Sequence, residues 1–169
     1  MSDQPRSQSP RRQRVAVYGL CRNDAGDVLL TRAAPHLTVA GRWFLPGGGI
    51  DHGEQPTDAL RREMFEETGL EATVSQLLGV LSDTAVMPDG TDLHTVRIIY
   101  RIGAVRGEVR HEANGTTDVA RFTPVAELGG LELMPYVVRV LHDYAGVEGL
   151  TAVAGVPKTV PTAAPRPVP

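Results

Sequence analysis

A segment rich in glycine and proline that runs directly into a helical pattern constrains this chain more than any other feature of its sequence. The stretch GRWFLPGGGIDHGEQP, residues 41–56, is too rich in these residues for regular structure and predicts a loop. The pattern turns helical over residues 57–68, with Thr57 as the expected N-cap and Gly69 as the stop. The fold must therefore place a glycine-rich turn directly before a short helix.

The helix carries three glutamates on one side. Glu63, Glu66 and Glu67 fall within an arc of about 100°, because successive helical residues turn by about 100°. Like charges this close repel one another, so two interpretations compete. Either this side faces water, with Arg62 pairing to Glu66, or a cation lies in front of it.

The glycine turn favours the cation. Residues 46–49, PGGG, allow backbone carbonyls to approach a ligand closely, because glycine has no side chain. Carboxylate and carbonyl oxygens together are the ligands that hard divalent cations prefer. Metal binding therefore explains the crowded glutamates better than a solvated face does.

Residues 48–70 begin in this turn and include the whole predicted helix. Their sequence, GGIDHGEQPTDALRREMFEETGL, resembles the Nudix box of the Nudix hydrolases. The matching positions are Gly48, Glu54, Arg62, Glu63, Glu66, Glu67, Gly69 and Leu70. Met64 stands where isoleucine, leucine or valine is usual, and methionine packs similarly. The resemblance extends over most of residues 14–145.

The resemblance implies a fold and a reaction. The fold is an α/β/α sandwich with a mixed β-sheet between helices, which agrees with strands interleaved with two helices. The reaction is divalent-metal-dependent hydrolysis of a nucleoside diphosphate linked to a group X. The preferred substrate is a nucleoside triphosphate, oxidised ones included, giving a nucleoside monophosphate and pyrophosphate. ADP-ribose, FAD and dinucleoside polyphosphates are alternatives, and a catalytically inactive nucleotide-binding regulator is the alternative from another class.

The resemblance also implies roles for the matching residues. Glu66 and Glu67 would ligate Mg²⁺ or Mn²⁺, and Glu63 would ligate a second metal or orient the attacking water. Arg62 would hold a glutamate in place. A carbonyl of the turn formed by Gly47 and Gly48 would complete the metal site.

Further candidates lie outside the helix. Glu54 would support the junction of loop and helix together with Gly47. Relatives often add a carboxylate from a later loop, and Glu112 is preferred here over Glu108 and Asp118.

Two residues that precede the box are candidates for substrate binding. Arg32 could meet a phosphate, and an ordinary surface ion pair is the alternative. Trp43 could stack on a base, and packing in the core is the alternative.

The rest of the chain sets the domain organisation. Strands are predicted at residues 14–22, 27–32, 72–81, 93–105 and 118–125, and a second helix at residues 135–146. That helix should bury Val137, Val138, Leu141 and Tyr144. Residues 1–12 are expected to be a disordered leader, residues 13–149 the domain, and residues 150–169 a disordered tail rich in alanine, proline and valine.

Composition excludes several functions. With a formal net charge of −3 and no run of lysine or arginine inside the domain, a polynucleotide is not an expected partner. No apolar stretch approaches the roughly 18 residues of a membrane span. The single cysteine, Cys21, cannot form an internal disulfide and is expected in the core, which favours the cytoplasm. The expected partner is a small nucleotide, and a homodimer is left open.

Overall fold

The structure of the protein is a computed structural model, and it describes residues 10–112, 115–153 and 159–160. In chain order the elements are β1 (Arg11–Leu20), β2 (Val28–Ala33), β3 (Trp43–Phe44), β4 (Gly47–Gly49), α1 (Pro56–Thr68), β5 (Glu71–Val86), β6 (Asp92–Arg106), β7 (Thr117–Thr123), the 3-10 helix η1 (Val125–Gly130), α2 (Pro135–Ala145) and β8 (Thr159–Val160). Of the leader expected at residues 1–12, residues 1–9 lie outside the described residues. Strand β1 begins at Arg11, so the last two residues of the expected leader belong to a strand. Most of the tail expected at residues 150–169 also lies outside them.

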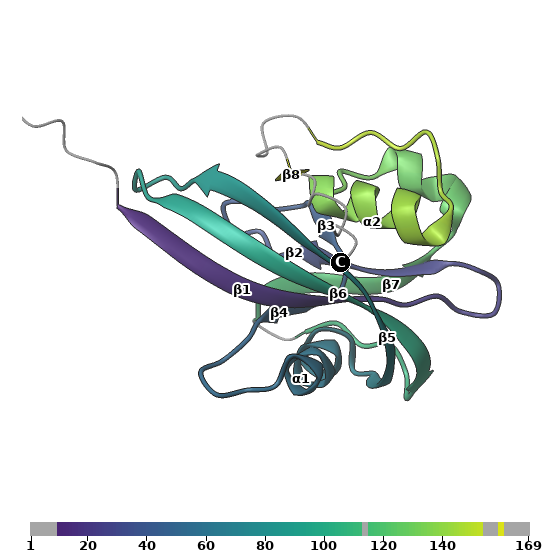
Figure 1. Ribbon diagram of the computed structural model, residues 1–169. Coiled ribbons are helices and arrows are strands. Elements are labelled where there is room, and N and C mark those ends of the chain that lie inside the picture. The colour runs from purple at the N-terminus through teal and green to yellow at the C-terminus, as the bar shows by residue number, and fades with distance from the viewer. Residues whose placement is uncertain (1–9, 113–114, 154–158, 161–169) are drawn as a thin grey trace, which may run out of the picture.

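Two β-sheets lie between the two α-helices (Figure 1). One has five strands in the order β4-β1-β6-β5-β8, and the other has three in the order β3-β2-β7. Strands β1 and β6 are parallel, whereas the other strand pairs of the described residues are antiparallel. The predicted α/β/α sandwich with mixed strand directions is therefore confirmed, with two sheets instead of one between the helices.

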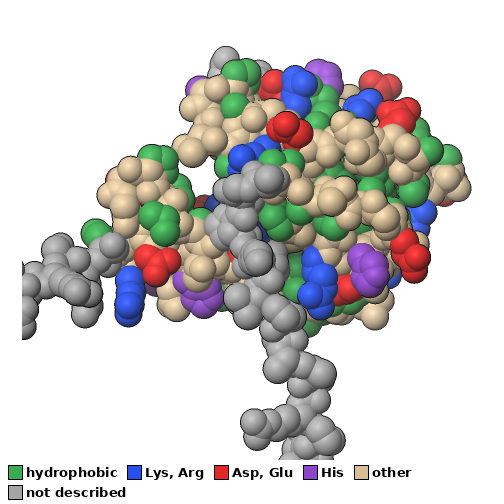
Figure 2. Space-filling view, turned by 90° about the horizontal axis from the view of Figure 1, so that it is seen from above, with side chains coloured by type: hydrophobic (Ala, Val, Ile, Leu, Met, Phe, Trp, Pro, Cys, Tyr) green, Lys and Arg blue, Asp and Glu red, His purple; other side chains and the backbone are tan. Residues whose placement is uncertain are grey.

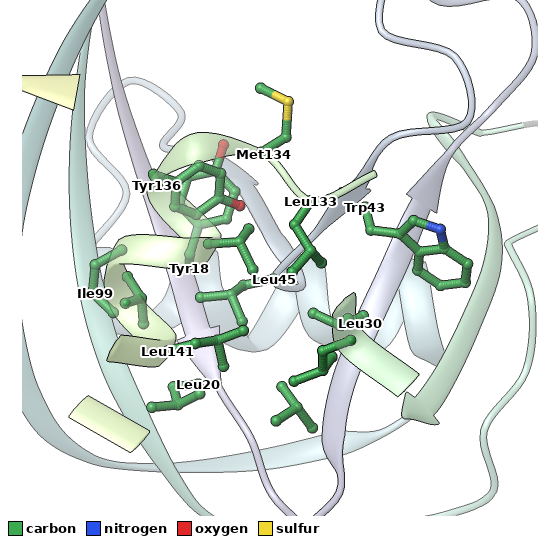
Figure 3. Close-up of a cluster of buried hydrophobic side chains, with 14 of the residues drawn as sticks. Tyr18, Leu20, Leu30, Trp43, Leu45, Ile99, Leu133, Met134, Tyr136 and Leu141 are labelled. Atoms are coloured by element: carbon green, nitrogen blue, oxygen red, sulfur yellow. The ribbon is translucent and has the colours of Figure 1, made fainter. Parts of the chain in front are cut away.

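Successive side chains of β1 point to opposite faces of the sheet, and hydrophobic side chains lie on both faces. Ala16, Tyr18 and Leu20 belong to the core beneath α2, whereas Val17 belongs to the core beneath α1. Figure 3 shows the core beneath α2, where Tyr18 and Leu20 lie near side chains from α2. Cys21 is buried beneath α1, and this burial raises the pKa of its thiol to about 11, which agrees with a core role.

The predicted loop at residues 41–56 contains two short strands, β3 and β4, that the sequence did not reveal. Strand β4 is three glycines that lie directly against β1, and Gly47 has a φ of 138°. A Cβ atom on Gly47 would lie 2.1 Å from the carbonyl oxygen of Val17. The absence of side chains, which suggested a loop, is what lets this strand pair so closely.

The two helices end close to their predicted limits. Helix α1 begins at Pro56, with Gln55 in place of Thr57 at the N-cap and no capping bond from a side chain. Proline suits the first position because the amide hydrogen that it lacks would have no partner inside the helix. In α2, Val137 and Leu141 are fully buried as predicted, whereas Val138 and Tyr144 are only partly buried.

Strands β1, β5 and β6 continue beyond the helices at the left of Figure 1. Residues 11–15 of β1 pair with residues 92–96 of β6, and the side chains of residues 11–15 are exposed. Strand β5 runs to Val86, five residues past the predicted end at Leu81. The glycines of β4 pair further along β1, with Ala16, Val17 and Tyr18.

A buried ion pair joins β5 to β6. Arg97 Nη1 donates a hydrogen bond of 2.5 Å to Asp83 Oδ2, and its guanidinium lies 4.7 Å from the ring centre of Tyr136. Both charged side chains are almost fully removed from solvent. The pair belongs to the α2 side of the sheet and fixes two neighbouring strands to that helix.

On the face seen from above, acidic and basic side chains are interspersed over the visible described residues (Figure 2). Such mixing is unlike the single-sign surfaces that track a nucleic-acid backbone. Among the described residues, none of the helices has the length and apolar character needed to cross a bilayer.

Candidate active site

Helix α1 and strand β4 build the candidate site. The inner side of α1 buries Ala59, Leu60 and Met64 completely. These three residues pack against the core beneath α1. This packing fixes the rotation of the helix, so that the predicted glutamates lie at its border with β4.

Glu67 is the most buried of these glutamates, with 5% of its surface exposed. Its Oε2 accepts a hydrogen bond of 2.9 Å from the backbone N–H of Gly47. Burial raises the pKa of Glu67 to about 8, against the lowering effect of that hydrogen bond, and the nearby Glu63, Glu112 and Glu66 raise it further. This carboxyl group is therefore mostly protonated at neutral pH, and a cation beside it would favour the ionised form.

Glu63 lies against the middle glycine of β4. A Cβ atom on Gly48 would lie 2.6 Å from the Glu63 carboxyl group, so a side chain at this position would displace that carboxyl group. Burial raises the pKa of Glu63, and the hydrogen bond from Arg62 opposes this rise. Glu66 is more open, with 50% of its side chain exposed, and lies 3.3 Å from Arg62 Nη1.

Arg62 ties the loop to the helix. Its Nε and Nη2 donate to the two carboxylate oxygens of Glu54, each at 3.0 Å, and Nη2 also donates to the carbonyl of Gly49 at 3.1 Å. Its Nη1 donates to Glu63 at 2.9 Å. The hydrogen bonds that Arg62 donates to Glu54 hold the pKa of Arg62 above its usual range, and the same pair lowers the pKa of Glu54. All three nitrogens of the Arg62 guanidinium therefore donate hydrogen bonds to acceptors within the protein.

The three candidates for an added carboxylate differ in their surroundings. Glu112 accepts hydrogen bonds from the backbone N–H and the hydroxyl of Thr117, at 3.0 and 3.1 Å, and is near enough to raise the pKa of Glu67. Asp118 is instead held by Arg32 in a two-pronged ion pair of 2.9 and 2.8 Å. Glu108 is exposed. Glu112 therefore lies near the predicted site, whereas Asp118 is paired with Arg32.

Arg32 and Trp43 occupy positions that match their alternative interpretations. Arg32 makes the ion pair with Asp118, so a phosphate would have to compete with a carboxylate for it. Trp43 is 7% exposed and packs in the core beneath α2. The guanidiniums of Arg32 and Arg121 lie 5.9 and 5.1 Å from its ring centre, and Arg121 was not singled out by the sequence.

The site offers only oxygen ligands. Within the described residues, no three side chains of His, Cys, Asp or Glu converge as a metal cluster. Instead Glu63 bonds to Arg62, Glu67 to the Gly47 amide and Glu112 to Thr117. Carboxylates and backbone carbonyls suit Mg²⁺ or Mn²⁺ better than a soft metal, so the donor set fits the predicted ions.

The raised pKa of Glu67 makes stability depend on pH. Its folded pKa of about 8 lies above the ordinary value of 4.5, so the folded protein binds this proton more tightly than the unfolded chain. The contribution of Glu67 is therefore full below about pH 4.5 and is lost as the pH rises through 8. Thermal melts without metal should show Tm falling from pH 5 to pH 8, and saturating Mg²⁺ should raise Tm more at pH 8 than at pH 5.

The matched control for these melts is Glu67→Gln, which cannot ionise. Its Tm should respond less to pH than that of the wild type, and its Mg²⁺ shift should be smaller at pH 8. Equal Mg²⁺ shifts at both pH values in wild type and variant would contradict the assignment of this effect to Glu67.

Comparison with known proteins identifies the family. The sequence model of the NUDIX domain matches residues 10–142. The chain therefore belongs to the Nudix family, which confirms the predicted resemblance and the predicted class of enzyme, a hydrolase acting on phosphoric anhydride bonds.

The curated relatives carry several names. The chain is 30% identical over 146 residues to a MutT-like protein of Streptomyces ambofaciens, covering 86% of each chain. It is 35% identical over 96 residues to an ADP-ribose pyrophosphatase of Methanocaldococcus jannaschii, covering 57% of this chain and 54% of that protein. It is 38% identical over 105 residues to the nucleoside triphosphatase NudI of Escherichia coli, covering 59% of this chain and 74% of NudI.

A solved structure supports the same fold. The crystal structure of a MutT NUDIX hydrolase from Burkholderia pseudomallei superposes with a TM-score of 0.67 at 27% sequence identity. The match covers 79% of this chain and 98% of that one.

Proposed function

We propose that this protein is a divalent-metal-dependent pyrophosphohydrolase that cleaves nucleoside triphosphates, oxidised ones included, to nucleoside monophosphate and pyrophosphate. The observation that carries the proposal is Glu67, a buried carboxylate that lies among three others, whose charge Arg62 offsets only in part. Such a group is costly without a cation. A divalent ion that shares a diphosphate with it removes this cost.

Mg²⁺ or Mn²⁺ would be held by Glu66, Glu67, Glu63, Glu112 and a carbonyl of the Gly48 turn. When bound, the ion offsets the charge that develops on the phosphate oxygens and lowers the pKa of a bound water.

The protein itself supplies position. The Gly47 amide fixes one oxygen of Glu67, and Arg62 holds Glu63 from the side of the loop. Glu54 holds Arg62 in turn and accepts the backbone N–H of Asp51, which ties the loop to the helix. The carboxylates are thereby preorganised, which is the main demand of phosphoryl-transfer chemistry.

The preference for nucleoside triphosphates draws support from the relatives named MutT-like and nucleoside triphosphatase. The relative named ADP-ribose pyrophosphatase supports ADP-ribose as the second candidate. FAD and dinucleoside polyphosphates fit the same site chemistry. An inactive nucleotide-binding regulator would have no need of the glutamates, all of which this chain retains.

A substrate panel tests this proposal. The panel contains the common and 8-oxidised nucleoside triphosphates, ADP-ribose, FAD and diadenosine polyphosphates, each with Mg²⁺ and with Mn²⁺, and products are resolved by chromatography. We expect nucleoside monophosphate and pyrophosphate from the triphosphates, at a higher kcat/KM than for the other compounds. A higher kcat/KM for ADP-ribose would replace the preferred substrate with the second. Metal-independent binding without turnover of any compound would favour the regulator.

A further inference from the structure

The candidate site carries more negative than positive charge. Glu63, Glu66, Glu67 and Glu112 supply four carboxylates, and Arg62 is already bonded to protein acceptors. The proposed substrate, a nucleoside triphosphate, carries an anionic phosphate chain. Metal ions offset part of this charge, and a cationic side chain that is free to bond phosphate would offset more.

Arg14 is such a cation. It lies on the exposed first half of β1, two residues before Ala16, which pairs with Gly49 of β4. A Cβ atom on Gly49 would lie 3.7 Å from both Nε and Nη2 of Arg14. In the part of the chain that the structure describes, the Arg14 guanidinium has no hydrogen bond and no ion pair, unlike those of Arg62 and Arg32.

Strand β4, which consists of three glycines, lies between Arg14 and the glutamates. Successive residues of a strand point to opposite faces. The Glu63 carboxyl fills the side-chain position of Gly48, and the Arg14 guanidinium borders the side-chain position of Gly49. The Arg14 guanidinium is also close enough to the Glu63 carboxyl for the two charges to attract each other.

We infer that Arg14 binds the phosphate chain of the substrate. In this arrangement one end of the chain lies at the glutamates proposed to bind metal, and the chain continues past β4 to Arg14. This inference rests on the proposed function and adds a substrate-binding residue to it. The lack of a side chain at Gly49 keeps the approach to Arg14 open. Arg14 positions phosphate and does not take part in the bond that breaks.

The test compares Arg14→Gln with Arg12→Gln. Arg12 is an exposed arginine on the same strand, two residues away, and serves as the matched control. With the best nucleotide of the panel, Arg14→Gln should raise KM about tenfold and change kcat little, as expected for the loss of one charged hydrogen bond. Arg12→Gln should leave both constants unchanged, and Arg14→Lys should recover part of the lost affinity because it keeps the charge.

A binding measurement separates this inference from the proposed function. Titration calorimetry with inorganic pyrophosphate and Mg²⁺ should give a Kd about tenfold weaker for Arg14→Gln than for Arg12→Gln, with equal Tm values for the two variants. Equal KM and equal Kd in the two variants would overturn the role of Arg14. If the wild type hydrolyses no nucleotide, the proposed function fails, and the pyrophosphate titration still decides whether Arg14 binds phosphate.

Discussion

Replacing Glu67 by glutamine is expected to lower kcat on the order of 10²-fold or more at saturating Mg²⁺. The amide keeps the size of the side chain and can still accept the hydrogen bond from Gly47, but it cannot supply a negative oxygen to a metal ion. The loss should therefore appear in catalysis and not in folding. Glu66→Gln should fall in the same range.

Steady-state kinetics over a series of Mg²⁺ concentrations measures this effect. Glu71→Gln is the control, because Glu71 is an exposed glutamate at the start of β5, just past the end of α1. It should retain wild-type kcat. Near-normal turnover of Glu67→Gln, together with an unchanged Mg²⁺ dependence, would remove Glu67 from the metal site.

Gly47→Ala is expected to lower the free energy of unfolding by about 4 kcal/mol, from backbone strain and steric overlap together. The φ of 138° is one that residues with side chains rarely adopt. The added methyl group would lie 2.1 Å from the Val17 carbonyl oxygen and 2.8 Å from Tyr18 Cα, and both are backbone atoms that cannot turn aside. Strand β4 would have to leave β1 and would take the Glu67 contact with it.

Urea denaturation gives the comparison, with Gly53→Ala as the matched variant. Gly53 lies in the same loop with a φ of 82°, but a Cβ atom there would have no neighbour within 4 Å. It should cost only the strain of the backbone, about 1 kcal/mol. A loss for Gly47→Ala no larger than that for Gly53→Ala would show that β4 can move away from β1 at little cost.

Local periodicity explains why the helices could be predicted from the sequence. Helix α1 was expected at residues 57–68 and is found at Pro56–Thr68, because apolar residues at helical spacing and Gly69 mark it clearly. Glu63, Glu66 and Glu67 share that helix, so their mutual placement followed from the helical repeat alone. Their partner Gly47 could be proposed because it precedes the same helix in a short loop.

Contacts between distant segments could not be predicted in this way. Asp83 lies beyond the strand predicted at residues 72–81 and Arg97 lies within the one at 93–105, and only the pairing of β5 with β6 shows that they form an ion pair in the core. The ion pair of Arg32 with Asp118 likewise depends on the pairing of β2 with β7. Arg14 stood at the edge of the expected leader, and its position beside Gly49 follows from the register of β1 against β4.

The parallel pairing of β1 with β6 has a consequence for how the chain matures on the ribosome. Gln13 and His94, which contact each other across this pair, are separated by 81 positions in the sequence. The first strand therefore emerges before its partner β6 is synthesised, and until then only its pairing with β4 can form. Because pairing between segments so far apart in the sequence forms slowly, we expect the pairing of β1 with β6 to be a late step that limits the folding rate.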